Sequence, residues 1–278
     1  MTPVTNVDRC LSLIEALAES AGGLPLGSLA QRVDMPKSAT HRLLQTLASR
    51  GYVEQDRSTQ NYDLSLKVAT LAFRFLDGRR LPDVAQGALD ALARRCGEYC
   101  RLAVVAGEGL VWVARSQGAM HGLRYDPPMS RDVVLHATAT GKAWLASLPE
   151  ADALRIVCGR GFATPPGFGA RAAKSVDELR RRLDDARRRG YAVAIEEGEP
   201  GTVAIATVFR ASEAADAPVA GTVSIAGPQV RLGRERVAAL APMLLETAGE
   251  LAKRWPVRAR QFESTDVPTG DRATSVQP

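Results

Sequence analysis

Apolar residues recur at helical spacing in the first part of the chain. Their period predicts helices over residues 7–18, 26–33 and 37–50. Pro36 favours the start of the third helix because its fixed φ suits the first helical turn, and Gly51 favours its end because glycine tolerates the left-handed conformation of a C-cap. The pattern therefore predicts two short helices, a tight turn and a third helix.

The period then changes from that of a helix to that of a strand. Apolar and polar residues alternate in 52–54 and again in 61–64, on either side of a polar turn at 56–60, which predicts a small β-hairpin. A further helix is expected from Leu66 to about Leu76. Three helices followed by a hairpin form the pattern of a winged helix–turn–helix, whose third helix lies in the major groove of DNA.

The third predicted helix carries side chains that suit base recognition. Small and hydrogen-bonding groups lie near its N-terminus, while Leu43, Leu44 and Leu47 occupy the opposite face. Basic and amide groups in the hairpin turn suit contacts with the DNA backbone or the minor groove. The candidate DNA-binding residues are Lys37, Ser38, Thr40, His41, Arg42, Gln45, Arg57 and Gln60.

The distribution of charge supports DNA binding only within the helix–turn–helix and hairpin segment. The net charge of +5 is a mild basic excess, and residues 1–78 hold equal numbers of basic and acidic side chains. Within residues 24–62, basic side chains outnumber acidic ones. The alternative is a protein-interaction module with a solvated polar face. DNA binding therefore has to follow from the local arrangement of side chains and not from bulk charge.

The second half of the chain alternates between helices and strands. Helices are expected over 82–96, 137–148, 150–157, 175–189 and 232–254, and strands over 100–106, 110–115, 191–196, 202–209 and 219–226, with a further candidate strand at 122–125. The segment after residue 255 is poor in apolar residues, so it is expected to be disordered.

Several segments, in order along the chain, resemble IclR-type bacterial transcriptional regulators. PKSATHRLLQTLASRGYVEQD and YDLSLKVATLA look like the DNA-binding domain of that family; LHATATGKAWLASLP, RRRGYAVAIEEGEPGTVAIA and GTVSIAGP look like its C-terminal domain. The resemblance implies an α+β fold, in which an N-terminal winged helix–turn–helix is joined by a linker helix to a GAF/PAS-like α/β effector-binding domain with an antiparallel sheet. The expected parts are residues 1–64, 65–80 and 81–255, followed by a disordered tail at 256–278.

The same resemblance implies a function and partners. Proteins of this family are cytoplasmic repressors or activators that bind double-stranded operator DNA as homodimers or tetramers. A small-molecule effector controls them, and no cofactor is implied; a catabolic operon is the expected target. Ala69, Ala72, Phe73 and Leu76 form an apolar stripe on the linker helix. We expect this stripe to pack on a dimer mate, since dimers read symmetric half-sites; the alternative is packing against its own domain.

The resemblance also places an effector pocket in the second domain. Its expected lining residues are Thr138, Ala139, Thr140, Ala194, Ala204, Ser224 and Ala226. Relatives often carry larger or polar residues where this chain has alanine at 194, 204 and 226, so we expect a roomier, less polar pocket that suits an aromatic or otherwise partly apolar acid. The alternative is that Met129, Ile205 or Val223 fills the space.

An enzyme, or a ligand-binding module with an N-terminal protein-interaction domain, is the competing class. The sequence holds no G-x-S-x-G, G-x-G-x-x-G or P-loop motif. His136 is a candidate base that is better explained as a helix-end contact, and Glu196 and Glu197 are better explained as loop-bracing residues. The 4 cysteines form no C-x-x-C pair and the 3 histidines are scattered, so no metal site is expected. No apolar run approaches a membrane span, and a secretory signal is not expected.

Overall fold

The computed structural model describes residues 5–78 and 81–255. The chain divides into two compact units, with the division after Gly78, and each unit is described by itself. The tail predicted to be disordered, 256–278, lies outside the described residues, as do the last two positions of the predicted linker, 79–80.

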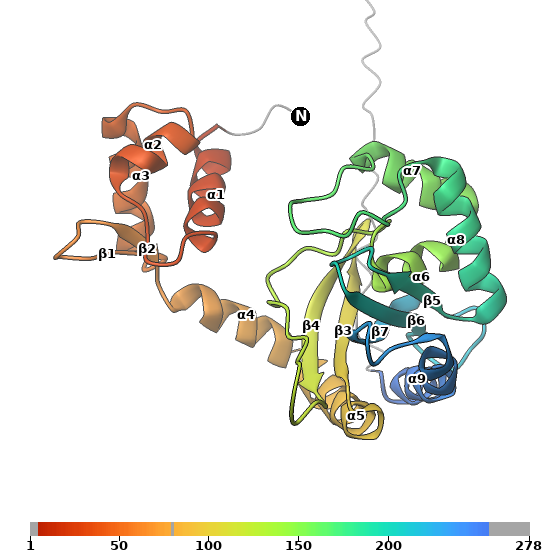
Figure 1. The fold of residues 1–278 in the computed structure, drawn as a ribbon. Coiled ribbons are helices and arrows are strands. Elements are labelled where there is room, and N and C mark those ends of the chain that lie inside the picture. The colour runs from red at the N-terminus through yellow and green to blue at the C-terminus, as the bar shows by residue number, and fades with distance from the viewer. Residues whose placement is uncertain (1–4, 79–80, 256–278) are drawn as a thin grey trace, which may run out of the picture. The chain divides into compact units, whose positions relative to one another are not determined.

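The first unit has the elements that the hydrophobic pattern predicts (Figure 1). They are α1 (Thr5–Ala18), α2 (Leu26–Arg32), α3 (Lys37–Ser49), β1 (Val53–Gln55), β2 (Tyr62–Leu64) and α4 (Lys67–Asp77). Buried leucines from α1, α2 and α3, Leu17, Leu29 and Leu44 among them, pack against Val53 and Tyr62 of the hairpin. The core therefore fixes α3 against both α2 and the hairpin.

The second unit is a five-stranded antiparallel sheet between layers of helices. Its strand order is β4-β3-β7-β6-β5, with α5 and α9 on one face and α6 and α8 on the other (Figure 1). The elements are α5 (Leu81–Cys96), β3 (Tyr99–Ala106), β4 (Gly109–Gln117), α6 (Ala139–Ser147), α7 (Glu150–Arg160), α8 (Val176–Arg189), β5 (Ala192–Ile195), β6 (Thr202–Arg210), β7 (Val219–Pro228) and α9 (Arg234–Arg254).

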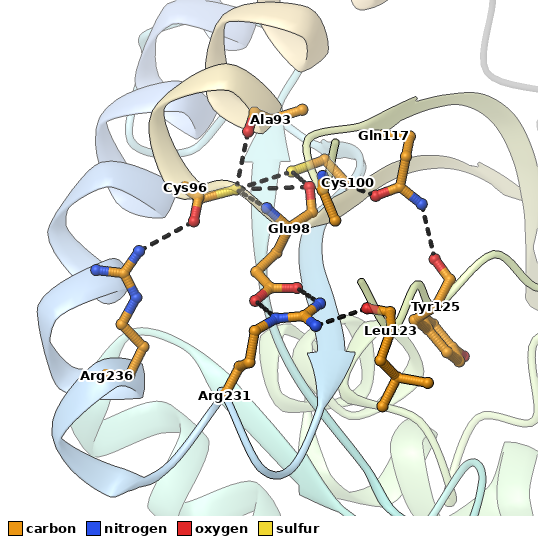
Figure 2. A network of polar contacts seen from close by, with 10 residues as sticks. Ala93, Cys96, Glu98, Cys100, Gln117, Leu123, Tyr125, Arg231 and Arg236 are labelled. Carbon is orange, nitrogen blue, oxygen red and sulfur yellow. Dashed lines mark hydrogen bonds and ion pairs between the residues drawn. The ribbon is translucent and has the colours of Figure 1, made fainter. Parts of the chain in front are cut away.

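The candidate strand at 122–125 is not formed; this prediction is wrong. Two of the backbone carbonyls in this segment bond to side chains instead of to a neighbouring strand: Arg231 Nη1 donates to Leu123 O at 2.6 Å, and Gln117 Nε2 donates to Tyr125 O at 3.0 Å (Figure 2). Gly122, at φ 77°, also interrupts the extended conformation. The segment from β4 to α6 is therefore a loop held by side chains.

Two buried, free cysteines lie at the end of α5 and the start of β3. Cys96 and Cys100 have their Sγ atoms 3.6 Å apart (Figure 2). Beside them, Glu98 accepts a bidentate ion pair from Arg231, with both N–O distances at 2.7 Å. This contact ties the segment between β7 and α9 to the turn between α5 and β3. Among the residues that the structure describes, no group of histidine, cysteine and acidic side chains could hold a metal ion.

Helix α6 begins with a tightly constrained turn. Thr138 is its N-cap, and the Thr138 hydroxyl accepts from Gly141 N at 3.0 Å and donates to Val134 O at 3.0 Å. Gly141 packs directly on the backbone of Leu135, where an added Cβ would lie 2.4 Å from Leu135 O. A side chain at position 141 is therefore incompatible with the present path of the chain.

We expect Gly141→Ala to lower the free energy of unfolding by about 1–3 kcal/mol, because the new methyl group forces helix and backbone apart. Gly249 is the matched control: it lies inside α9 with no atom within 4 Å of its Cβ position. Gly249→Ala should raise stability by about 0.5–1 kcal/mol through helix propensity. Urea unfolding of both variants measures the difference; equal effects would contradict the packing argument.

Candidate functional site

The polar face of α3 is accessible in the first unit. Lys37, Ser38, Arg42 and Gln45 are exposed, and His41 is half-buried. The N-cap of α3 is Pro36, and no side chain caps the helix. Backbone N–H groups of the first turn therefore remain directed outward beside Lys37, an arrangement that favours a phosphate.

Thr40 does not belong to this face, and its prediction as a DNA-binding residue is wrong. Its side chain is fully buried, and its hydroxyl donates to Pro36 O at 3.2 Å. The reason is helical phase: Thr40, Leu44 and Leu47 follow one another at spacings of four and three residues, so all three face the core. A small polar residue at a core position of the helix looks like a surface group in the sequence alone.

The turn of the hairpin, residues 56–61, is ordered by one carboxylate. Asp56 Oδ1 accepts from Ser58 N at 2.8 Å and from Thr59 N at 2.7 Å, and from both hydroxyls. These hydrogen bonds, chiefly that from the Ser58 hydroxyl, lower the pKa of Asp56 to about 2. The turn keeps its shape at neutral pH because the carboxylate is charged there.

Arg57 and Gln60, the predicted contact residues of this turn, are both exposed. Gln60 has φ 60° and already donates its amide to Arg57 O at 2.9 Å, so it shapes the turn. The Arg57 guanidinium has no hydrogen-bond partner among the residues that the structure describes. Arg57 is the freer of the two for an external contact.

In the second unit, one cavity lies between the sheet and the start of α6. All the predicted effector-binding residues line it: Thr138, Ala139, Thr140, Ala194, Ala204, Ser224 and Ala226. Strand register explains how distant positions meet. Ala194 pairs with Ala204 and Ala204 with Ala226, which forms one row across β5, β6 and β7. Ser224 lies two residues from Ala226 on the same face.

The same alternation removes the alternative that neighbouring apolar residues fill the space. Ile205 directly follows the cavity-lining Ala204, and Val223 directly precedes the cavity-lining Ser224. Their side chains therefore point to the opposite face of the sheet, and neither residue lines the cavity. Met129 is not among the described residues that line the cavity.

The cavity also has walls that the sequence did not indicate. They add aromatic rings and charged groups to the apolar alanine row. The residues are Arg101, Trp112, Tyr125, Arg131, Asp132, Phe168, Gly198, Glu199 and Thr202. Arg101 pairs directly with Ser224 across β3 and β7. A charged residue inside an otherwise apolar strand, Tyr99–Ala106, was the available signal.

Arg101 is buried and held from several sides. Its Nη2 donates to Pro127 O at 2.6 Å and Pro128 O at 3.1 Å, and its Nε donates to the Tyr99 hydroxyl at 3.1 Å. Its guanidinium lies 4.6 Å from the Trp112 ring centroid. No carboxylate forms an ion pair with it in the part of the chain that the structure describes.

Arg131 is the other cation that lines the cavity, and its charge is balanced by an acidic partner. It forms an ion pair with Glu199 and lies over the Phe168 ring, 5.7 Å from the centroid. The two arginines therefore differ in kind, because only Arg131 has an acidic partner.

A buried charge cluster holds the walls of the cavity together. Lys142 Nζ, on α6, donates to Glu197 Oε1 at 2.6 Å, Glu197 Oε2 at 2.7 Å and Val193 O at 2.7 Å. Arg182 of α8 also bonds Glu197. Burial lowers the pKa of Lys142 to about 8 although Glu197 opposes the shift. Glu196 bonds Arg171 at 3.2 Å, so the loop-bracing interpretation of both glutamates is confirmed.

His136 has the surroundings of a packed residue. It is buried, its ring meets Phe162 edge-on at 5.3 Å, and its Nε2 has no hydrogen-bond partner in the described part of the chain. Burial lowers its pKa. His136 does not line the cavity, so it is not placed to act on a ligand there.

A winged helix–turn–helix with an open polar helix face, followed by an α/β unit with a cavity lined by arginines and aromatic rings, defines a ligand-responsive DNA-binding regulator. The chain matches the family model of the bacterial transcriptional regulator IclR C-terminal domain over residues 73–253 and that of the IclR helix-turn-helix domain over residues 6–57. The chain belongs to the IclR family of DNA-binding transcriptional regulators, with a C-terminal effector-binding domain.

Relatives agree with this assignment over most of their length. The HTH-type transcriptional regulator BhcR of Paracoccus denitrificans is 32% identical over 251 residues, which cover 90% of this chain and 86% of that protein. The transcriptional repressor IclR of Escherichia coli is 28% identical over 250 residues, covering 89% of each.

Solved structures show the same fold. An IclR transcriptional regulator from Alicyclobacillus acidocaldarius has a TM-score of 0.75 at 21% identity, covering 90% of this chain and 98% of that one. An IclR homologue from Microbacterium hydrocarbonoxydans, crystallised with 4-hydroxybenzoate, has a TM-score of 0.70 at 22% identity, covering 89% and 97%. Among the described residues, no helix is long and apolar enough to cross a membrane.

We expect Lys142→Met to lower the free energy of unfolding by about 3 kcal/mol, because Arg182 is then the one charged partner left to the buried Glu197 among the residues that the structure describes. The double variant Lys142→Met/Glu197→Gln should regain part of that loss, since glutamine carries no charge to bury. Chemical unfolding measures both. A double variant no more stable than the single one would show that Lys142 acts through packing alone.

Proposed function

We propose that this regulator controls a catabolic operon and that a small organic acid with an aromatic or partly apolar body sets its affinity for operator DNA. The main observation in support is the set of residues that line the cavity. Its walls combine arginines with Trp112, Tyr125 and Phe168 and with a row of alanine methyls. Such walls suit a ligand that is anionic at one end and flat and apolar at the other. The structural neighbour crystallised with 4-hydroxybenzoate supports the same ligand class.

Operator recognition is assigned to α3 and the hairpin turn. Arg42, His41 and Gln45 lie where base edges would be read, and Ser38 and Lys37 lie at the helix N-terminus, where a phosphate is favoured. Arg57 reaches the DNA backbone or minor groove, and Gln60 supports the turn. Thr40 is not included, because it is buried.

A homodimer, or a pair of dimers, is the proposed assembly, with α4 as the contact. None of the residues of α4 is buried within the described chain, although the helix is mostly apolar. Phe73 is 64% exposed, and Ala69 and Ala72 of the predicted stripe are exposed as well. An exposed apolar face of this kind marks an interaction surface. A second copy of α4 covers it and brings two DNA-binding units to symmetric half-sites.

The remaining assignments complete the proposal. Residues 1–64 form the DNA-binding domain, 65–80 the linker and 81–255 the effector-binding domain. The protein acts in the cytoplasm, needs no cofactor and turns over no substrate. An enzyme assay with the effector acid tests the last point, because the acid should be recovered unchanged.

We expect Arg42→Ala to reduce discrimination between operator and unrelated DNA by about 1–3 kcal/mol, as for the loss of one base contact. Lys37→Ala should weaken binding to all DNA alike and reduce the salt-dependence slope by about one, since a phosphate contact carries no sequence information. Gel-shift titration at several salt concentrations, on a duplex selected from a random library, separates the two. Unchanged selectivity in both Arg42→Ala and His41→Ala would move the recognition surface elsewhere.

The proposed dimer contact through α4 leads to a second prediction. Phe73→Glu should dissociate the dimer and reduce DNA affinity through lost bivalency, because the buried contact would then contain a charge. Arg74→Glu places the same side chain at a polar position of α4 and should leave the dimer intact. Sedimentation velocity measures the assembly. A Phe73→Glu variant that sediments as the wild-type dimer would place the interface on another surface.

A further inference from the structure

We infer that Arg101 is the residue that binds the carboxylate of the effector and that it makes this regulator selective for acids over neutral molecules of the same shape. The inference rests on the proposed function, which places an acid in the cavity but does not say which group receives its charge. Arg101 is distinguished from the other polar residues of the cavity by three observations: its uncompensated charge, its fixed position and its unused donors.

The charge of Arg101 is buried without a counterion. Its residue exposure is 6%, and a guanidinium stays protonated in proteins. Of the acids that line the cavity, Glu199 is paired with Arg131, and Asp132 is exposed and lies beyond ion-pair distance of Arg101. Buried charges are normally paired, because an unpaired one loses its hydration without compensation. A ligand carboxylate in the cavity supplies the missing charge.

The position of Arg101 is fixed before any ligand arrives. The Pro127 and Pro128 carbonyls and the Tyr99 hydroxyl hold Nη2 and Nε. The guanidinium also lies near two rings, 5.1 Å from the Tyr99 centroid and 4.6 Å from that of Trp112. A group fixed in this way loses little side-chain entropy when it binds, which favours affinity.

Unused donors remain for the ligand. The hydrogen bonds of the Arg101 side chain use Nε and Nη2, so Nη1 has no hydrogen-bond partner among the residues that the structure describes, and the side chain lines the cavity. The Thr140 hydroxyl, also at the cavity wall, is likewise without a partner in the described ranges. The hydroxyl of Thr138, by contrast, is used in capping α6. The carboxylate is therefore received by Nη1, with the ligand body against the rings and the alanine row.

The test compares a charged ligand with its neutral isostere. Benzoate and benzamide have nearly the same shape, so isothermal titration calorimetry of both isolates the contribution of the charge. Wild-type protein should bind benzoate at least roughly tenfold more tightly than benzamide, as for one charge-assisted hydrogen bond. Arg101→Gln should remove that preference by weakening benzoate binding while benzamide binding changes little. Arg101→Lys should keep part of it.

Matched controls distinguish failure of this inference from failure of the proposed function. Arg155→Gln removes an exposed guanidinium that pairs with Glu108, outside the cavity, and should retain the full preference. Thermal unfolding checks that each variant is folded. Operator binding without acid is measured in parallel: wild-type protein that binds no DNA overturns the proposed function and leaves the ligand result standing.

Several results would overturn the inference. A folded Arg101→Gln variant that still prefers benzoate shows that another group binds the carboxylate. If no Arg101 variant folds, the wild-type comparison decides, because equal affinity for benzoate and benzamide excludes recognition of the charge. Absence of binding by either compound at millimolar concentration excludes a simple aromatic monocarboxylate as the ligand class.

Discussion

The buried ion pair between Lys142 and Glu197 is the interaction on which the effector-binding unit depends. It joins α6, which supplies Thr138 to Thr140 of the cavity, to the connection between β5 and β6, which supplies Gly198 and Glu199. Arg182 extends the contact to α8. Both charged groups are buried, so each must keep its ion-pair partner to offset the loss of hydration. This requirement fixes the positions of the two side chains. The cavity has a defined shape because these segments cannot move independently.

The arginines of the cavity show how similar side chains take different roles. Arg131 is neutralised by Glu199 and lies over Phe168, so it completes a wall. Arg101 is fixed by neutral groups only, so its charge is left to act on whatever enters. Because electrostatic interactions are stronger in a site shielded from water, the uncompensated cation contributes more to selectivity than its number of contacts suggests.

Hydrophobic period and turn residues predicted the helices and strands with few errors, because most elements have one clearly apolar face. Thr40 was misassigned because a threonine at a core position looks polar in sequence although it bonds its own helix. The strand predicted at 122–125 does not form because the side chains of Arg231 and Gln117 donate hydrogen bonds to its carbonyls. Nothing in the local hydrophobic pattern indicates these contacts. The alanine row could be predicted through resemblance, whereas Arg101, Trp112 and Phe168 come together only through strand register and loop packing, which no local pattern records.

The first turn of α6 has a consequence for genetic studies of this regulator. Neighbouring positions there have separate structural roles: Thr138 caps the helix, Gly141 allows close approach of the Leu135 backbone, and Lys142 carries the buried charge. Thr140 between them faces the cavity. A screen for alleles that do not respond to the effector will therefore recover folding defects and ligand-contact defects in the same few codons. Loss of response in this stretch identifies a binding residue only when protein abundance has been measured for the same allele.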